Sequence, residues 1–218
     1  DTARRATGFI VGHDYVAIDE VKKVQFGDVS EMQSIFQGYM ESGKCDVNGF
    51  SVTSDAGVVF LGNIETNNMD EYKNMFTELP TLFKESALVD RMHGFIKGWD
   101  IPPMKPELKI SNWALNTEYF CSILHLLRND ISYRAIVDRL HVEAVKRLTT
   151  AYLKLFFPNV RSVKDVDAHL FMQYCLHPAI KMRAIIQKQL EILDPDEYRK
   201  PAKQMPQFSL KEIPDEEN

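Results

Sequence analysis

Two short, continuous apolar runs stand out in the first third of the chain. The first run is Tyr15-Val16-Ala17-Ile18, and the second is Val58-Val59-Phe60-Leu61. Uninterrupted apolar runs of this length are typical of strands in a parallel sheet that is covered on both faces. We therefore predict two buried parallel strands in this part of the chain.

Between these runs the apolar residues recur at helical spacing. Asp28 with Glu31 matches a capping box, and Gly43 suits the position just past a helix. The apolar face between these caps consists of Val29, Met32, Ile35, Phe36, Tyr39 and Met40. Asn48-Gly49 is the strongest two-residue hairpin signal. The pattern predicts a helix over 28–43 followed by a hairpin over 44–52.

A proline-rich segment divides the chain. Because the run Ile101-Pro102-Pro103-Met104-Lys105-Pro106 cannot continue a helix or a central strand, we place a domain boundary there. Before it, residues 69–93 have the pattern of helical pieces broken at Pro80, and residues 94–96 that of a strand. After it, the apolar spacing predicts helices over about 113–128, 132–140, 143–157, 163–176 and 178–193.

Two local signals support the last two of these helices. Ser162 with Asp165 makes a capping signature for the helix over 163–176, and Pro178 suits the first turn of the helix over 178–193. The expected organisation is α/β, with an α/β part followed by an all-helical part. Its divisions are 1–100 for the α/β part, 101–106 for a proline hinge, 107–193 for the helical part and 194–218 for a linker or disordered acidic tail.

Composition narrows the function classes. The 218 residues are 44% hydrophobic and 26% charged, which is ordinary for a globular protein. A net charge of −5 gives no global attraction to nucleic acid, so any such binding must be local. No apolar run approaches the length of a membrane span and no signal peptide opens the chain, so we expect no membrane partner and a cytoplasmic location. The start at Asp1 rather than Met suggests a piece of a longer protein.

The three cysteines are far apart and lie in apolar surroundings. An odd number at such spacing does not match a disulfide framework or a zinc site. We therefore expect reduced core residues at Cys45, Cys121 and Cys175.

Two carboxylates, Asp19 and Glu20, directly follow the first predicted strand. Carboxylates are seldom buried without a partner, so a pair at the end of a core strand needs a cause. The functional interpretation is the second nucleotide-binding motif of an ATPase, in which Asp19 holds Mg²⁺ and Glu20 orients the attacking water. The alternative is a strand that meets a solvated acidic turn.

A polar residue also follows the second predicted strand, at Asn63. Site residues of parallel sheets lie at the carboxyl ends of the strands, where Asn63 would stand. The alternative is an asparagine that caps the next turn. Further along, Arg91 follows the short segment Ala87-Leu88-Val89-Asp90. It is either a surface ion-pair residue or an arginine finger, which reaches the γ-phosphate held by a neighbouring subunit.

One segment imitates a phosphate-binding loop. Gly38 to Lys44 has the spacing G-x4-G-K, but Cys45 stands where Ser or Thr must reach Mg²⁺. A phosphate loop follows a strand and opens a helix, whereas this segment closes a predicted helix. We therefore interpret it as a helix terminus.

The order and spacing of these features resemble the AAA+ ATPase module, from its second nucleotide motif to its helical lid. The run Leu88-Val89-Asp90-Arg91-Met92 looks most like the Lon branch. The longer run from Asp90 to Pro102, DRMHGFIKGWDIP, is similar to the Lon-like AAA+ protein of bacterial BREX phage-defence systems, and so is Lys154-Leu155-Phe156-Phe157-Pro158. The resemblance covers roughly residues 8–193.

The resemblance implies a role for each matching residue. Asp19 and Glu20 become the Mg²⁺-binding and water-activating pair, Asn63 the sensor that positions the water, and Arg91 the finger that acts in trans. A basic residue that touches the phosphates of ATP would come from the run Ala144-Val145-Lys146-Arg147-Leu148. Both Lys146 and Arg147 fit this sensor-2 role, with Arg147 favoured, and a solvated basic helix face is the alternative.

The resemblance also implies a polymer contact and two departures. The hairpin over 44–52 stands where related hexamers line their pore, so Lys44 and Asn48 are candidate contacts. The family's phosphate loop lies upstream of the Asp-Glu strand, and its Ser-Lys peptidase domain would begin near residue 205. Neither is found in this sequence, so we expect the chain alone to be inactive and to bind ATP weakly.

Three functions follow as hypotheses. The first is part of a hexameric, Mg²⁺-dependent AAA+ ATPase that hydrolyses ATP between identical subunits and acts on DNA in antiviral defence. The second is a Lon-type ATP-dependent peptidase that threads protein through the same pore. The third is a degenerate AAA+ fold that serves only in assembly.

Overall fold

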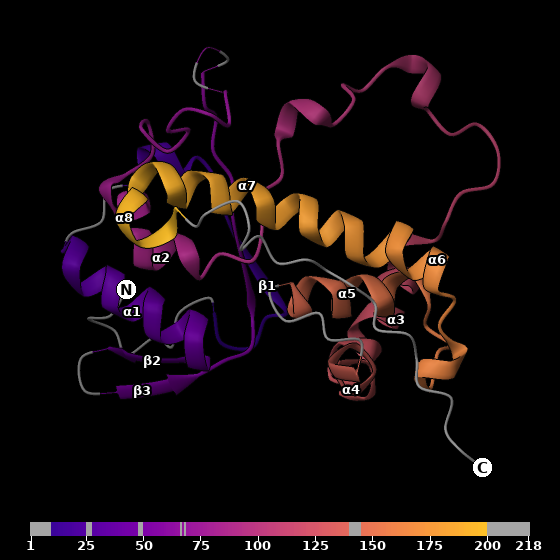
Figure 1. The fold of residues 1–218 in the computed structure, drawn as a ribbon. Helices are drawn as coiled ribbons and strands as arrows, with labels where there is room; N and C mark the ends of the chain where they lie inside the picture. Colours follow the sequence, from indigo (N-terminus) through magenta and orange to yellow (C-terminus); the bar gives the residue numbers. More distant parts are fainter. Residues whose placement is uncertain are drawn as a thin grey trace. The chain divides into compact units, whose positions relative to one another are not determined.

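The fold is described from a computed structural model, which covers residues 10–24, 28–47, 50–65, 67, 69–139 and 145–199 (Figure 1). The chain divides into two compact units. The first, here the α/β unit, takes the described residues as far as Met92 and again from Ile185 to Arg199. The second, here the helical unit, takes the described residues from His93 to Ala184. The division after Met92 reflects how compact each unit is and does not test a hinge. The boundary at 101–106 therefore stays a prediction.

The α/β unit contains two small sheets. In one, β1 (Tyr15–Ile18) pairs in parallel with β4 (Gly57–Phe60), in a register that sets Tyr15 against Gly57 and Ile18 against Phe60. In the other, β2 (Lys44–Val47) pairs antiparallel with β3 (Phe50–Thr53). The helical elements described in this unit are η2 (Val21–Lys23), α1 (Val29–Ser42), η4 (Thr81–Lys84), α2 (Ser86–Asp90), the end of α7 (His177–Leu193) and α8 (Pro195–Tyr198).

The ends of α1 are where the sequence predicts them. Asp28 accepts a hydrogen bond from the backbone N–H of Glu31 at 3.0 Å, which satisfies one of the unpaired N–H groups of the first turn. At the other end, Gly43 adopts a left-handed φ of 72° and its N–H donates to Tyr39 O. The segment from Gly38 to Lys44 therefore closes a helix and enters β2, which confirms that it is no phosphate loop.

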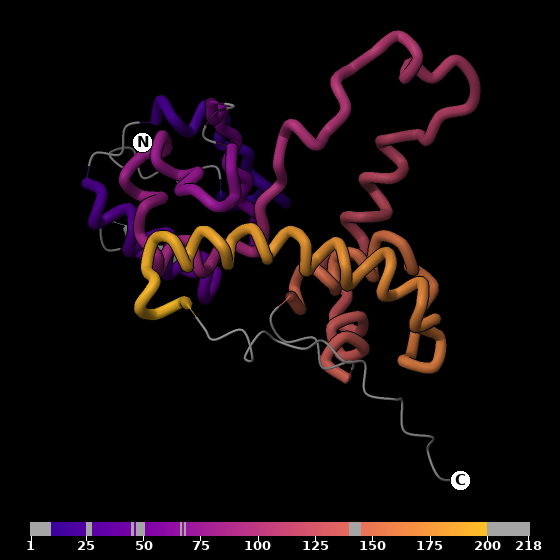
Figure 2. Tube along the Cα trace, turned by 45° about the horizontal axis from the view of Figure 1, so that its top comes forward, coloured from indigo at the N-terminus to yellow at the C-terminus, as the bar shows by residue number. Residues whose placement is uncertain are grey.

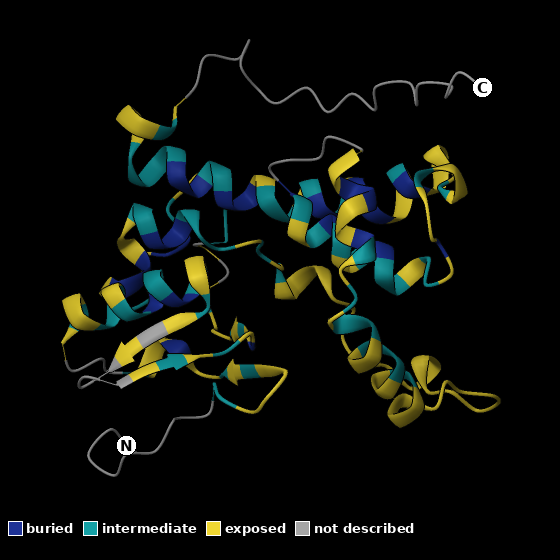
Figure 3. Cartoon of the chain, turned by 90° about the horizontal axis from the view of Figure 1, so that it is seen from below, coloured by how far each residue is buried: buried dark blue, intermediate teal, exposed yellow. Residues whose placement is uncertain are grey.

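The two parallel strands are less buried than the sequence predicts. Along β1 and β4 exposed and half-buried residues alternate, and Tyr15 keeps 68% and Val59 45% of its surface in contact with solvent (Figure 3). Within the described residues, one face of the sheet is covered, by a cluster built around Val21, Phe36, Leu82, Phe83 and Leu88. Ile18 and Phe60 pack against it. An apolar run signals a strand, but its burial depends on whether both faces receive a cover.

The helical unit is built from α3 (Thr117–Arg128), α4 (Ser132–Arg139), α5 (Lys146–Phe156), α6 (Ala168–Phe171) and the first part of α7 (His177–Leu193). This unit has an apolar core of its own. The buried members are Tyr133, Ile136, Val137, Val145, Leu153, Val160, Phe171, Cys175, Leu176 and Ala179. The prediction of an all-helical part is confirmed for the described residues.

The prediction of separate helices over 163–176 and 178–193 is wrong in detail. The capping box of Ser162 and Asp165 is present, but it caps only the single turn η7 (Val163–Asp165). Helix α6 begins after Asp167, and a π-helical turn, Met172–Leu176, joins it to α7 without a break. Pro178 therefore lies inside a continuous helix. Proline removes a helical N–H bond and crowds the preceding turn, and a π-turn is one of the local adjustments that accompany such a site.

The segment between α2 and α3 has little regular structure. Residues 94–96 form no strand, contrary to the prediction. Instead Phe95 donates its backbone N–H to Met182 O at 3.2 Å, which provides the pairing that a strand would have supplied. From Gly98 to Tyr119 every residue is exposed, and the helical turns η5 (Gly98–Asp100) and η6 (Pro106–Leu108) interrupt an open loop (Figure 2).

The cysteines divide by position. Cys175 is buried in the core of the helical unit, and burial raises the pKa of its thiol to about 12. Cys121 is exposed on α3, so the prediction of a core position is wrong for this residue. The side chain of Cys45 lies outside the described residues. Among the described helices, none combines the length and the apolar character that crossing a membrane requires.

Candidate nucleotide site

The parallel pairing of β1 and β4 brings the carboxyl ends of both strands to one edge of the sheet. Leu61 donates its backbone N–H to Ile18 O at 2.8 Å, and Val21 donates to Leu61 O at 2.9 Å. These bonds continue the pairing past the strand ends. Asp19 and Glu20 therefore stand beside the segment that leads to Asn63, and all three residues are exposed. The roles predicted for these residues stay predictions.

Glu20 has a strained backbone. Its φ of 50° and ψ of 40° lie in the left-handed region, and it is the one non-glycine residue with positive φ among those described. Such a conformation costs of order 1 kcal/mol or more for an ordinary residue and is concentrated at functional sites. Its backbone N–H donates to Asp19 Oδ1 at 2.7 Å, and its carboxylate accepts from Lys23 Nζ at 2.7 Å. The strain thus lies at the residue assigned to water activation.

The donor atoms at this edge fit a magnesium–nucleotide complex in part. Mg²⁺ is usually held by one or two carboxylates together with phosphate oxygens and water, and Asp19 supplies such a carboxylate. No group of three or more His, Cys, Asp or Glu side chains in the described part of the chain can hold an ion by itself. The side chain of Asn63 makes no hydrogen bond to either carboxylate here. Binding of the ion at this edge would need the phosphates of ATP.

Arg91 also belongs to the α/β unit but contacts none of these three residues. It follows α2, where its Nη1 donates to Ala87 O at 2.8 Å and its Nη2 lies 3.4 Å from Glu41 Oε2. The guanidinium carries five N–H donors, so these two contacts leave capacity for an anion. A half-buried arginine beside a carboxylate fits both interpretations from the sequence, the ion-pair residue and the finger.

The two sensor-2 candidates lie at the start of α5, in the helical unit, and have different partners. Lys146 forms an ion pair with Asp138 on α4, whereas Arg147 is exposed and its Nη1 lies 2.9 Å from His93 Nε2. Because arginine only donates, Nε2 is the acceptor. Partial burial of the imidazole, and then the charges of Arg147 and Arg183, hold the pKa of His93 below its usual value. His93 is therefore in the neutral form that can accept the bond.

The hairpin candidates are only partly described. Lys44 begins β2, is exposed, and donates its backbone N–H to Ser42 Oγ at 3.3 Å. Asn48 lies outside the described residues. Two residues that contact the candidate arginines were not singled out from the sequence: Glu41 beside Arg91 in the α/β unit, and His93 beside Arg147 in the helical unit. Their signal was weak, because an exposed glutamate on a helix and a histidine after a turn have no distinctive spacing.

In the α/β unit, Asp19-Glu20 and Asn63 follow two adjacent parallel strands, and the helical unit is formed by the chain between the two segments of the α/β unit. This organisation is compatible with the class of ATPase domains. A family model described as "Lon-like protease BrxL-like, ATPase domain" matches residues 1–204. The chain therefore belongs to this family of BrxL-like ATPase domains, which confirms the resemblance drawn from the motifs.

Two relatives show the extent of the similarity. The Lon-like protease BrxL of Escherichia coli O9:H4 (strain HS) is 30% identical over 204 residues, which cover 88% of this chain and 28% of the relative. The Lon-like protease BrxL of Bacillus cereus (strain H3081.97) is 29% identical over 184 residues, which cover 79% of this chain and 27% of the relative. The chain thus spans little more than a quarter of the length of these curated relatives.

Proposed function

We propose that this chain supplies the acidic part of an ATP-hydrolysing site in a ring-forming, Mg²⁺-dependent AAA+ ATPase. The observation that carries the proposal is the parallel register of β1 and β4, because it sets Asp19 and Glu20 beside the segment leading to Asn63. Membership of a BrxL-like ATPase domain family supports it. We assign binding of the Mg²⁺–ATP complex to Asp19, polarisation of the attacking water to Glu20 and orientation of that water to Asn63.

The arginines complete the assignment. Arg91 serves as the finger that enters the site of a neighbouring subunit, and Arg147 contacts the phosphates from the helical unit. Both cations have partners, Asp138 for Lys146 and His93 for Arg147, and we prefer Arg147 because it is exposed and a guanidinium can bind a phosphate through two N–H donors. Mg²⁺ bound with ATP neutralises charge that develops on the phosphate oxygens, and a cationic finger adds to this effect.

The wider role in this proposal is action on DNA in a BREX-type antiviral system, by a homo-oligomer that is a hexameric ring. Lys44 and Asn48 would contact the polymer in the pore. The name of both relatives, "Lon-like protease BrxL", favours a second candidate, an ATP-dependent peptidase acting on protein. Stimulation of ATP hydrolysis by double-stranded DNA and not by casein would separate the first candidate from the second.

The test of the ATPase assignment is Glu20→Gln in the protein at its full natural length. The amide keeps the size of the side chain but cannot act as a base, and loss of general-base catalysis typically costs about 10²- to 10⁴-fold in rate. We expect kcat for ATP hydrolysis to fall by at least about 10²-fold while ATP binding persists. The matched control is Glu31→Gln on α1. ATP turnover at the wild-type rate in Glu20→Gln would refute the assignment and favour the third hypothesis, a non-catalytic assembly module.

A further inference from the structure

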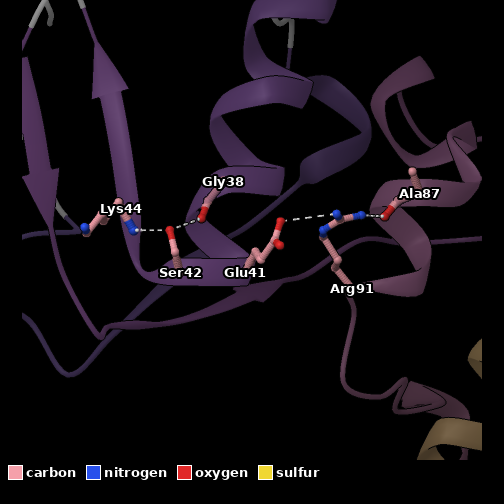
Figure 4. A network of polar contacts seen from close by, with 6 residues as sticks. All are labelled: Gly38, Glu41, Ser42, Lys44, Ala87 and Arg91. Carbon is pink, nitrogen blue, oxygen red and sulfur yellow. Dashed lines mark hydrogen bonds and ion pairs between the residues drawn. The ribbon is translucent and has the colours of Figure 1, made fainter.

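Arg91 is held by a carboxylate that comes from a distant part of the sequence. Glu41 lies in the last turn of α1, and its Oε2 is 3.4 Å from Arg91 Nη2 (Figure 4). The other end of the guanidinium donates to Ala87 O, one turn earlier on α2. Two contacts on different nitrogens restrict the rotation of a side chain that otherwise has many rotamers.

The backbones on both sides of this pair are fixed by packing. Helix α1 packs against α2. Met40 and Met92, the sequence neighbours of Glu41 and Arg91, both pack against the apolar cluster that contains Phe36 and Leu88. The separation of Glu41 from Arg91 is therefore set by the core of the α/β unit and not by the contact between the two side chains alone.

The end of α1 is also tied to the hairpin. Ser42 Oγ donates to Gly38 O at 2.8 Å and accepts from the backbone N–H of Lys44, the first residue of β2. Gly43 O accepts from Ser54 N–H at 2.8 Å, just past β3. Figure 4 shows Glu41 between Ser42, which is bonded to the first residue of β2, and Arg91, the candidate finger.

We propose that Glu41 is a positioning residue, which holds the guanidinium of Arg91 in the orientation that it needs in the neighbouring site. The inference rests on the proposed function, because it takes Arg91 to be the arginine finger. A finger that is already oriented loses less conformational entropy when it meets the developing charge. Glu41 itself does not contact nucleotide in this assignment.

The size of the effect expected for Glu41→Ala follows from how far the two side chains are exposed to solvent. The side chain of Glu41 is 69% and that of Arg91 33% exposed, and ion pairs between exposed groups contribute little. Removal of the finger itself costs about 10³-fold or more in rate. We therefore expect Glu41→Ala to lower kcat by only about two- to fivefold, with KM for ATP unchanged, because water exposure weakens the pair.

The test is a double-mutant cycle in the protein at its full natural length. The variants are Glu41→Ala, Arg91→Ala and the double variant, with Glu31→Ala as a control that removes the same charge from the same helix. If Glu41 acts through Arg91, the double variant has the kcat of Arg91→Ala alone. A double variant slower than Arg91→Ala by the same factor that Glu41→Ala shows alone would overturn the inference. A wild-type kcat in Arg91→Ala would overturn the proposed finger as well.

A mixing experiment covers the case in which Arg91→Ala is too slow to measure. Glu41→Ala subunits are mixed with an excess of Glu20→Gln subunits, and ATP hydrolysis is expressed per intact Glu20. Sites built by Glu41→Ala subunits then receive a correctly held Arg91 from their neighbours, and we expect the wild-type rate per site. A rate that stays at the level of Glu41→Ala alone would overturn the inference, because it would place the effect of Glu41 within its own subunit's site.

Discussion

The α/β unit and the helical unit hold their candidate arginines by different chemistry. Arg91 in the α/β unit contacts a carboxylate and a backbone carbonyl, whereas Arg147 in the helical unit contacts an imidazole. Histidine is the side chain whose ordinary pKa lies closest to neutral pH. The contact of Arg147 therefore depends on an unprotonated His93, whereas the contacts of Arg91 with Glu41 and Ala87 do not involve histidine.

The two units also differ in how they bury polar groups. Gln189, on the part of α7 that belongs to the α/β unit, is fully buried and completely paired, because Oε1 accepts from Met75 N–H at 2.9 Å and Nε2 donates to Glu71 O and Lys73 O. Thr149, on α5 of the helical unit, is equally buried, but its Oγ1 has no hydrogen-bond partner in the structure as described. Among the described residues, the buried amide of Gln189 is thus held by three hydrogen bonds, whereas the buried hydroxyl of Thr149 makes none.

The largest expected effect tests whether each of the two arginines serves the site of its own subunit or that of a neighbouring subunit. We expect Arg91→Ala to lower kcat by about 10³-fold, the usual cost of removing a finger. If Arg91 acts in trans, mixing with Glu20→Gln subunits restores part of the rate, because mixed interfaces combine an intact Glu20 with an intact Arg91. Arg147→Ala is not rescued in this way if Arg147 serves its own subunit's site. The measurement is steady-state ATP hydrolysis at varied mixing ratios, with Lys146→Ala as control. Equal rescue of both arginine variants would remove the distinction.

The next effect concerns the buried polar residues. Gln189→Met keeps the length of the side chain but leaves Met75 N–H and two carbonyls unpaired, which we expect to cost about 3 kcal/mol of local stability. Thr149→Val replaces an unpaired buried hydroxyl by a methyl group, and we expect a gain of about 1 kcal/mol. Hydrogen exchange measured by mass spectrometry gives both values, from peptides that contain residues 71–75 and residues 146–156. Destabilisation of the same size by both substitutions would contradict the contrast between the units.

The smallest effect is a pH dependence confined to the helical unit. The pKa of folded His93 lies below its usual value of 6.5, so as pH falls through that value the unfolded chain binds a proton before the folded chain does. Folding stability is therefore expected to fall as the pH drops below about 6.5, and the bond from Arg147 is lost once Nε2 is protonated. Thermal unfolding between about pH 7.5 and 5.5 measures this change.

A variant isolates the contribution of His93 from that of the other titrating groups. His93→Gln retains an acceptor for Arg147 but has no proton to take up, so its unfolding temperature is expected to fall less steeply with acid than that of the wild type. His169→Gln, at an exposed histidine of the same unit, serves as the control for replacing a histidine by glutamine. Identical slopes for wild type and His93→Gln would show that the lowered pKa has no measurable consequence.

Local interactions account for most of what was predictable. The ends of α1, the pairing of β2 with β3 and the run of helices after the proline-rich segment depend on residues close in sequence, through caps, turns and apolar spacing. The same holds for the order of Asp19-Glu20, Asn63 and Arg91, from which the family could be inferred. Where a local signal was misread, as at Ser162, the capping box formed but the following chain turned away after one turn.

The family and most of the order of the elements could be inferred from the residues alone, because these depend on residue type and short-range spacing. The packing of distant segments decided which face of the β1–β4 pair is covered. It decided too that α6 continues through a π-helical turn into α7, which contains Pro178. It also decided that Glu41 meets Arg91 and that His93 meets Arg147. Each of these contacts joins residues about 50 positions apart. Such a contact depends on how helices pack, which no short window of sequence records.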